Sequence, residues 1–127
     1  MWHTHALLFA RVLMGGFFLL AGISKASGID GTVGMIAGAG LPMPLVLAWL
    51  AAILEIAAGA AIILGKYFKE ASISLALFVF VISFIFHSPN SWAENMMQQL
   101  MFMKNMAIVA GLLFMAAHGA GKTWKVK

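Results

Sequence analysis

Polar positions divide the chain into four long apolar stretches, each continuous and without the alternation typical of a strand. They run from about His5 to Ala26, Pro44 to Gly65, Glu70 to His87 and Leu100 to His118. A membrane-spanning helix needs roughly 20 apolar residues, and a helix satisfies its own backbone hydrogen bonds inside lipid. The pattern therefore predicts an all-α membrane protein, a four-transmembrane-helix bundle that forms a single domain over residues 1–127.

The connections between these stretches differ in character. The first, "ASGIDGTVGMIAGAGLPMP", contains glycines and prolines that interrupt regular structure, yet half of it is apolar. We expect it to lie on the membrane surface or to fold back against the bundle, with a short helix around Thr32 to Ala39. The second connection, "KYFK", predicts a tight turn.

Composition supports a membrane location. Hydrophobic residues make up 63% of the chain and charged residues 9%, whereas about 25% of a soluble domain is charged. The absence of cysteine excludes disulfides, thiol chemistry, cysteine-based metal sites and covalently attached haem. The net charge of +4 does not indicate nucleic acid as a partner, because the few basic residues lie at the ends of apolar stretches.

The distribution of basic residues predicts an orientation. Cytoplasmic segments of membrane proteins carry an excess of lysine and arginine. If the N-terminus is cytoplasmic, the outer side carries Lys25 and Lys104 with Asp30 and Glu94. The inner side then carries Lys66, Lys69, Lys122, Lys125 and Lys127, with Arg11 near that end. The bias predicts that both termini are cytoplasmic.

Glu55 stands out because it lies near the middle of the second apolar stretch, "AWLAAILEIAAGAAIILG". An ionised side chain at the centre of a bilayer costs at least ~2.5–3.5 kcal/mol. Glu55 is therefore expected either to pair with a cation or to stay protonated. Arg11, Lys25 and Lys104 are the candidate partners, and depth in the membrane does not choose among them.

Helical spacing places the polar residues on faces that also carry small residues, where membrane helices approach closely. The polar groups are therefore expected to point toward one another. The four faces are Arg11, Gly15, Phe18, Gly22 and Lys25; Ala48, Ala51, Ala52, Glu55, Ala58 and Gly59; Phe80, Ser83 and His87; and Lys104, Ile108, Gly111, Met115 and His118.

Two readings of these polar residues stay open. In the structural reading, Glu55 and Arg11 form a clamp that sets helix register, Lys25 and Lys104 reach the outer interface, and His87 ends its helix. In the functional reading, the polar residues line a ligand site. The abundant methionines are expected to serve packing, and no metal site is predicted.

Several motifs together resemble the DoxX family. They are "R-x3-G…F…G-x2-K" from Arg11 to Lys25, "GLP" at Gly40–Pro42, "E-x3-G-x5-G" from Glu55 to Gly65, "FH" at Phe86–His87 and "FMKNMAIVAGLL" from Phe102 to Leu113. The resemblance implies a small four-span protein of the bacterial cytoplasmic (inner) membrane. It also implies a link to redox proteins, since some members are subunits of thiosulfate:quinone oxidoreductase and others act beside soluble enzymes in oxidative or thiol stress.

The resulting hypothesis is a membrane subunit of a redox or stress-response complex that binds a quinone-like or other small ligand between its helices. Glu55 and His87 would exchange protons as the catalytic pair, since histidine titrates near neutral pH. Lys25, Lys104, Asn105 and Arg11 would bind the ligand. Its apolar walls are expected to come from Phe18, Trp49, Phe80 and Phe84.

No covalently bound cofactor is expected, so electrons would come from a soluble or membrane redox partner, and a homo-oligomer is compatible with the sequence. Two other classes remain open. A small transporter or channel-like protein would also place charges inside the membrane. A membrane scaffold that anchors a partner would need the polar cluster only for stability.

Overall fold

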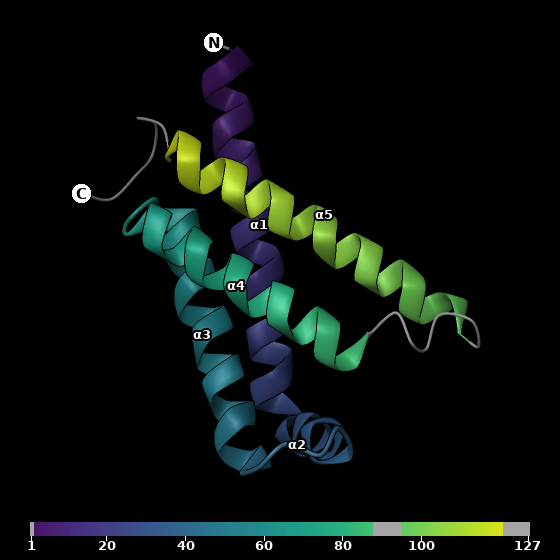
Figure 1. Ribbon diagram of the computed structural model, residues 1–127. Coiled ribbons are helices and arrows are strands. Elements are labelled where there is room, and N and C mark those ends of the chain that lie inside the picture. Colours follow the sequence, from purple (N-terminus) through teal and green to yellow (C-terminus); the bar gives the residue numbers. More distant parts are fainter. Residues whose placement is uncertain (1, 88–94, 121–127) are drawn as a thin grey trace.

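The computed structural model describes residues 2–87 and 95–120, and all regular structure in these residues is helical (Figure 1). Four of the helices are long and apolar enough to cross a membrane. This confirms an all-helical chain with four candidate spans. The helices are α1 (Trp2–Ser27), α2 (Ile29–Gly38), α3 (Pro44–Leu64), α4 (Phe68–Phe86) and α5 (Met96–His118).

All of the helices except α3 begin earlier than the apolar pattern predicts, and the difference is largest for α5. Helix α5 begins four residues before Leu100 because the side chain of Asn95 accepts a hydrogen bond from the backbone N–H of Met97, at 3.0 Å. Asparagine is a favoured residue at this capping position. Helix α2 begins at Ile29, earlier than expected in the first connection, and buries Ile36 against its neighbours.

Helices α1 and α3 are antiparallel and in close backbone contact. A Cβ atom added to Gly15 would lie 2.6 Å from the carbonyl oxygen of Gly59, and one added to Gly22 would lie 2.9 Å from that of Ala52. Real Cβ atoms do not approach other atoms this closely, so glycine is required at both positions. The small-residue faces predicted on these two helices are thus the faces that meet.

The tight turn between α3 and α4 depends on Gly65, which has a φ of 76°. The N–H of Lys66 donates to the carbonyl of Ala61 at 3.1 Å, and the N–H of Gly65 to that of Ile62 at 3.2 Å. These two hydrogen bonds form a Schellman motif, which favours glycine at the left-handed position. The turn reverses the chain directly into α4.

Helices α4 and α5 form a second pair, which crosses the α1–α3 pair obliquely (Figure 1). The core at the crossing contains Phe18, Ile62, Leu75 and Leu112. Helix α3 approaches α4 near their shared turn, and the two diverge toward α2, which lies beside the end of α1 and the start of α3 (Figure 1). This divergence leaves space between α2, α3 and α4.

The start of α1, the end of α5 and the α3–α4 turn lie at one end of the molecule, and α2 lies at the other (Figure 1). Both ends of the described chain are therefore on the same side of the bundle, as an even number of spans requires. Cytoplasmic placement of that side stays a prediction. Lys122, Lys125 and Lys127, which contributed to it, lie outside the described residues.

Candidate functional site

Glu55 forms an ion pair with Lys25. The Lys25 Nζ lies 2.7 Å from the Glu55 Oε1, and the two side chains are 30% and 5% exposed. Of the three candidate partners, the structure thus selects Lys25. The carboxylate is buried between α1 and α3, whereas the lysine reaches it from the edge of the helix pair.

The geometry of two antiparallel helices explains this pairing. Lys25 lies one turn after Gly22, and Glu55 lies one turn after Ala52, the residue that Gly22 contacts. Side chains on a helix tilt toward its N-terminus, so the two side chains tilt in opposite directions along the bundle and toward each other. The close approach at Gly22 therefore brings a lysine and a glutamate on different helices within contact distance.

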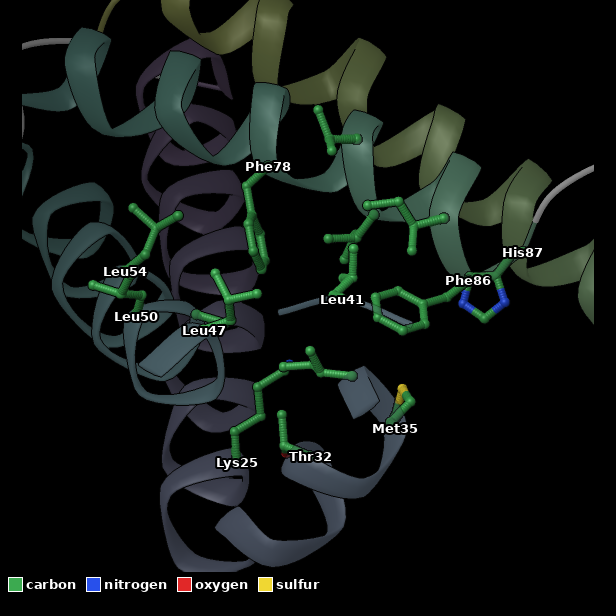
Figure 2. A pocket seen from close by; sticks show the side chains of 15 residues that line it. Lys25, Thr32, Met35, Leu41, Leu47, Leu50, Leu54, Phe78, Phe86 and His87 are labelled. Atoms are coloured by element: carbon green, nitrogen blue, oxygen red, sulfur yellow. The ribbon is translucent and has the colours of Figure 1, made fainter. Parts of the chain in front are cut away.

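A pocket of about 490 Å³ lies beside this ion pair, between α1, α2, α3 and α4. Most of its wall is aliphatic or aromatic, and Lys25, Thr32 and His87 are the lining residues with polar side chains (Figure 2). The lining residues are Lys25, Thr32, Met35, Ile36, Leu41, Leu47, Leu50, Ala51, Leu54, Phe78, Val81, Ile82, Ile85, Phe86 and His87. Pockets of about 300–1,000 Å³ with apolar walls and a few polar groups are typical of small-molecule sites.

The two basic side chains of the pocket lie on opposite sides of it. Figure 2 shows Lys25 near Thr32 at the α1–α2 side, and His87 beside Phe86 at the end of α4. The Nδ1 of His87 contacts the amide oxygen of Gln98 on α5. An amide oxygen accepts hydrogen bonds, so the ring nitrogen facing it carries the proton, and this contact holds the imidazole at the pocket edge.

The pocket opens at the surface of the helix bundle. Leu50 of α3 and Val81 of α4 line it and are more than half exposed, and Met35 of α2 is also exposed. In a membrane this surface faces the hydrocarbon chains. An apolar molecule could therefore enter the pocket from the bilayer without crossing water.

Arg11 lies at the other end of the α1–α3 pair, away from the pocket. Its guanidinium donates to the carbonyls of Ile62 at 3.3 Å, Ile63 at 2.7 Å and Ala120 at 3.5 Å. The last carbonyls of a helix have no partner within that helix, and a cation is favourable there. Arg11 thus stabilises the C-terminus of α3 and joins it to the residues after α5, and it does not form the expected clamp with Glu55.

Lys104 and Asn105 do not line the pocket either. Lys104 is exposed on α5, with its ammonium 3.6 Å from the sulfur of Met101 and 6.0 Å from the centre of the Phe17 ring. Asn105 is buried. Of the six predicted site residues, Lys25 pairs with Glu55 and lines the pocket with His87, and the other three lie elsewhere.

The aromatic side chains that were expected to form the pocket walls also lie away from the pocket. Phe18 is buried in the core, and Trp49, Phe80 and Phe84 are exposed on the surface of the bundle. Phe78 and Phe86 line the pocket instead. The 15 lining residues include Thr32, Met35 and Ile36 of α2 and Leu41 after it, which the sequence indicated only through the apolar character of the first connection.

The fold and site define a class: a four-span helical membrane protein with an ion pair beside an apolar pocket that opens at the surface of the bundle. Residues 6–88 match the DoxX family model. The chain belongs to the DoxX family, as its motifs suggested.

Two relatives are the inner membrane proteins YqjF and YphA of Escherichia coli strain K12. YqjF is 37% identical over 117 residues, which cover 90% of this chain and 84% of YqjF. YphA is 30% identical over 120 residues, which cover 91% of this chain and 84% of YphA. Together with the four apolar helices, these relatives show a multi-pass protein of the bacterial inner membrane. No solved structure matches the chain.

Proposed function

We propose that the protein is a membrane subunit that binds a quinone-like molecule in the pocket between α2, α3 and α4. The observation that supports this best is the placement of Lys25 and His87 on opposite sides of an apolar pocket of about 490 Å³. A quinone ring has two carbonyl oxygens at opposite ends, each able to accept a hydrogen bond. Its apolar tail would leave through the opening beside Leu50 and Val81.

The same residues suit the chemistry of quinone reduction. Conversion of a quinone to a quinol consumes two electrons and two protons. A redox protein partner would supply the electrons. His87, with both ring nitrogens protonated, would keep its Nδ1 proton toward Gln98 and transfer its Nε2 proton to the nearer carbonyl oxygen. The Lys25 ammonium would bind the other carbonyl oxygen and transfer the second proton to it, while Glu55 keeps the lysine in place through their 2.7 Å contact.

The test is binding of a short-tailed benzoquinone to the purified protein, measured by calorimetry in detergent. We expect His87→Ala and Lys25→Met each to weaken binding by about tenfold, the usual effect of losing a hydrogen bond to a charged group. Leu50→Trp is expected to weaken it further by filling the pocket, since Leu50 is exposed and the larger ring need not disturb a helix contact. Lys69→Met removes an exposed lysine at the start of α4, outside the pocket, and serves as the control.

Unchanged affinity in both His87→Ala and Leu50→Trp would exclude this pocket as the binding site. Robust movement of protons or solutes across liposomes in the absence of a redox partner would instead favour a transporter. Mass spectrometry of protein purified with native lipid provides an independent check, because a bound quinone should co-purify with wild type and be depleted in Leu50→Trp.

A further inference from the structure

A second hollow lies where α1 and α5 cross, and it shares no lining residue with the pocket. It is a groove of about 500 Å³ whose lining side chains are all apolar. Met14 and Gly111 form the crossing point, since a Cβ on Gly111 would lie 3.3 Å from the terminal methyl of Met14. The lining residues are Ala10, Leu13, Met14, Phe17, Ile108, Gly111, Phe114 and Met115.

One cation lies at the end of this groove. Lys104 shares the α5 face of Ile108, Gly111 and Met115, as the spacing predicted, and its ammonium is 6.0 Å from the ring of Phe17, a groove residue. Within the described residues, its polar contact is the Met101 sulfur, and no carboxylate forms an ion pair with it. Lys104 is thus a cation at an apolar groove that lacks an anionic partner in this part of the chain.

The depth of Lys104 makes this arrangement costly unless an anion meets it. It lies eight residues after the start of α5, which is about 12 Å along the helix axis. Its flanking residues on the exposed surface include Leu100 and Met103. A lysine side chain tilts toward the N-terminus of its helix, so the ammonium extends toward the start of α5 and away from the middle of that helix.

We propose that this groove binds an anionic phospholipid, with its phosphate at Lys104 and one acyl chain along α1 and α5. The charge of a phosphodiester complements the ammonium, and the apolar lining complements the chain. On α5 the groove wall runs from Ile108 to Met115, seven residues or about 10 Å, so it contacts part of one acyl chain. Basic positions beside transmembrane helices are known to select anionic head groups.

The experiment is native mass spectrometry of delipidated protein titrated with dioleoyl phosphatidylglycerol or dioleoyl phosphatidylcholine. The two lipids have the same chains and differ in head-group charge. We expect the wild type to bind the anionic lipid about fivefold more tightly, the effect of one lysine near an anionic head group. Lys104→Met should remove that preference, and Lys69→Met, an equal loss of charge at an exposed site on α4, should keep it.

A second variant tests the groove itself. Ala10 lines the groove and is exposed, so Ala10→Leu should fill part of it and weaken both lipids. Inorganic phosphate at millimolar concentration should leave lipid binding unchanged, because it lacks the acyl chains. Equal binding of the two lipids by the wild type, or equal preference in Lys104→Met and Lys69→Met, would overturn the proposal. Displacement by free phosphate would also overturn it, and so would a dimer that is lost in Lys104→Met while lipid preference is unchanged.

Discussion

At the scale of single residues, Glu55 is a buried carboxylate in an apolar helix, and Lys25 supplies the cation that pairs with it. Removing a carboxylate from water is costly, and the contact with an ammonium offsets this only when the geometry is good. The two charged groups lie 2.7 Å apart, and the 30% exposure of Lys25 lets the lysine keep some polar surroundings. The pair therefore serves stability and also presents a cation to the pocket.

The contribution of this pair can be measured with a double-mutant cycle. Lys25→Met leaves the Glu55 carboxylate buried without its cation, and we expect a loss of about 3 kcal/mol in the free energy of unfolding. Glu55→Gln should cost less, because the more exposed Lys25 can turn toward the pocket. The variant with both changes should regain most of the loss, as coupled neighbours do.

The measurement is unfolding in mixed micelles with increasing sodium dodecyl sulfate, followed by helical circular dichroism. Additive losses in the double variant would contradict direct coupling between the two side chains.

Arg11 shows how a residue type can suggest the wrong partner. Its planar fork suits a carboxylate, which made Glu55 a reasonable partner from sequence. The same fork also suits several carbonyl oxygens at once, and the C-terminus of α3 presents Ile62 and Ile63 beside it. The register of α1 against α3 decides between them, because it places Arg11 beside Ile62 and Ile63, two turns along α3 from Glu55.

At the scale of elements, the contact between α1 and α3 positions the ion pair. Lipid supplies no hydrophobic force between helices, so close packing of small residues has to hold them together. Gly15, Gly22 and Gly59 allow backbone contact along most of this interface. The position of Lys25 relative to Glu55 therefore depends on glycines one to three turns away.

We expect Gly59→Ala to separate the two helices. Its Cβ would lie 2.7 Å from the backbone oxygen of Gly15 and 2.7 Å from the backbone nitrogen of Leu19. Neither atom can move without shifting α1. We therefore expect the free energy of unfolding in detergent to fall by about 1–3 kcal/mol. Gly16→Ala is the matched control on α1, because nothing lies within 4 Å of its added Cβ. A similar stability for both variants would show that the α1–α3 contact is looser than described.

At the scale of the whole molecule, the oblique crossing of two helix pairs creates both hollows. Where α3 and α4 diverge, α2 covers the end of the gap and completes the pocket. Where α1 and α5 cross, the groove remains on the outer surface. Two surfaces of α1 thus contribute to different sites, one through Lys25 and one through Phe17.

The orientation of the molecule in the membrane is also testable at this scale. Because the chain has no cysteine, single cysteines can be introduced at exposed positions at the two ends, Asp30→Cys in α2 and Lys69→Cys in α4. If both termini are cytoplasmic, a membrane-impermeant maleimide added to cells with a permeabilised outer membrane should label the cysteine at 30 and not the one at 69. If only the cysteine at 69 is labelled, the orientation is the opposite one, with both termini outside the cytoplasm.

The sequence alone predicted the helices, the faces of α1 and α3 that meet, and the set of possible partners for Glu55. These features depend on local properties: the length of apolar stretches, the periodicity of small residues and the depth of charges. Spacing along the chain also encodes the depth and the helical face of each residue. The possible partners of Glu55 could therefore be limited to three cations.

Only the tertiary structure decided which of these residues share a site. Spacing places a residue on a face of its own helix, but the register and crossing angle of the neighbouring helix decide what that face meets. The antiparallel register of α1 and α3 brings Lys25 to Glu55, and the oblique crossing of α5 turns Lys104 away from them toward Phe17. Contacts between distant segments arise from packing of all the helices at once, and for that reason the pocket and the groove became visible only in the folded chain.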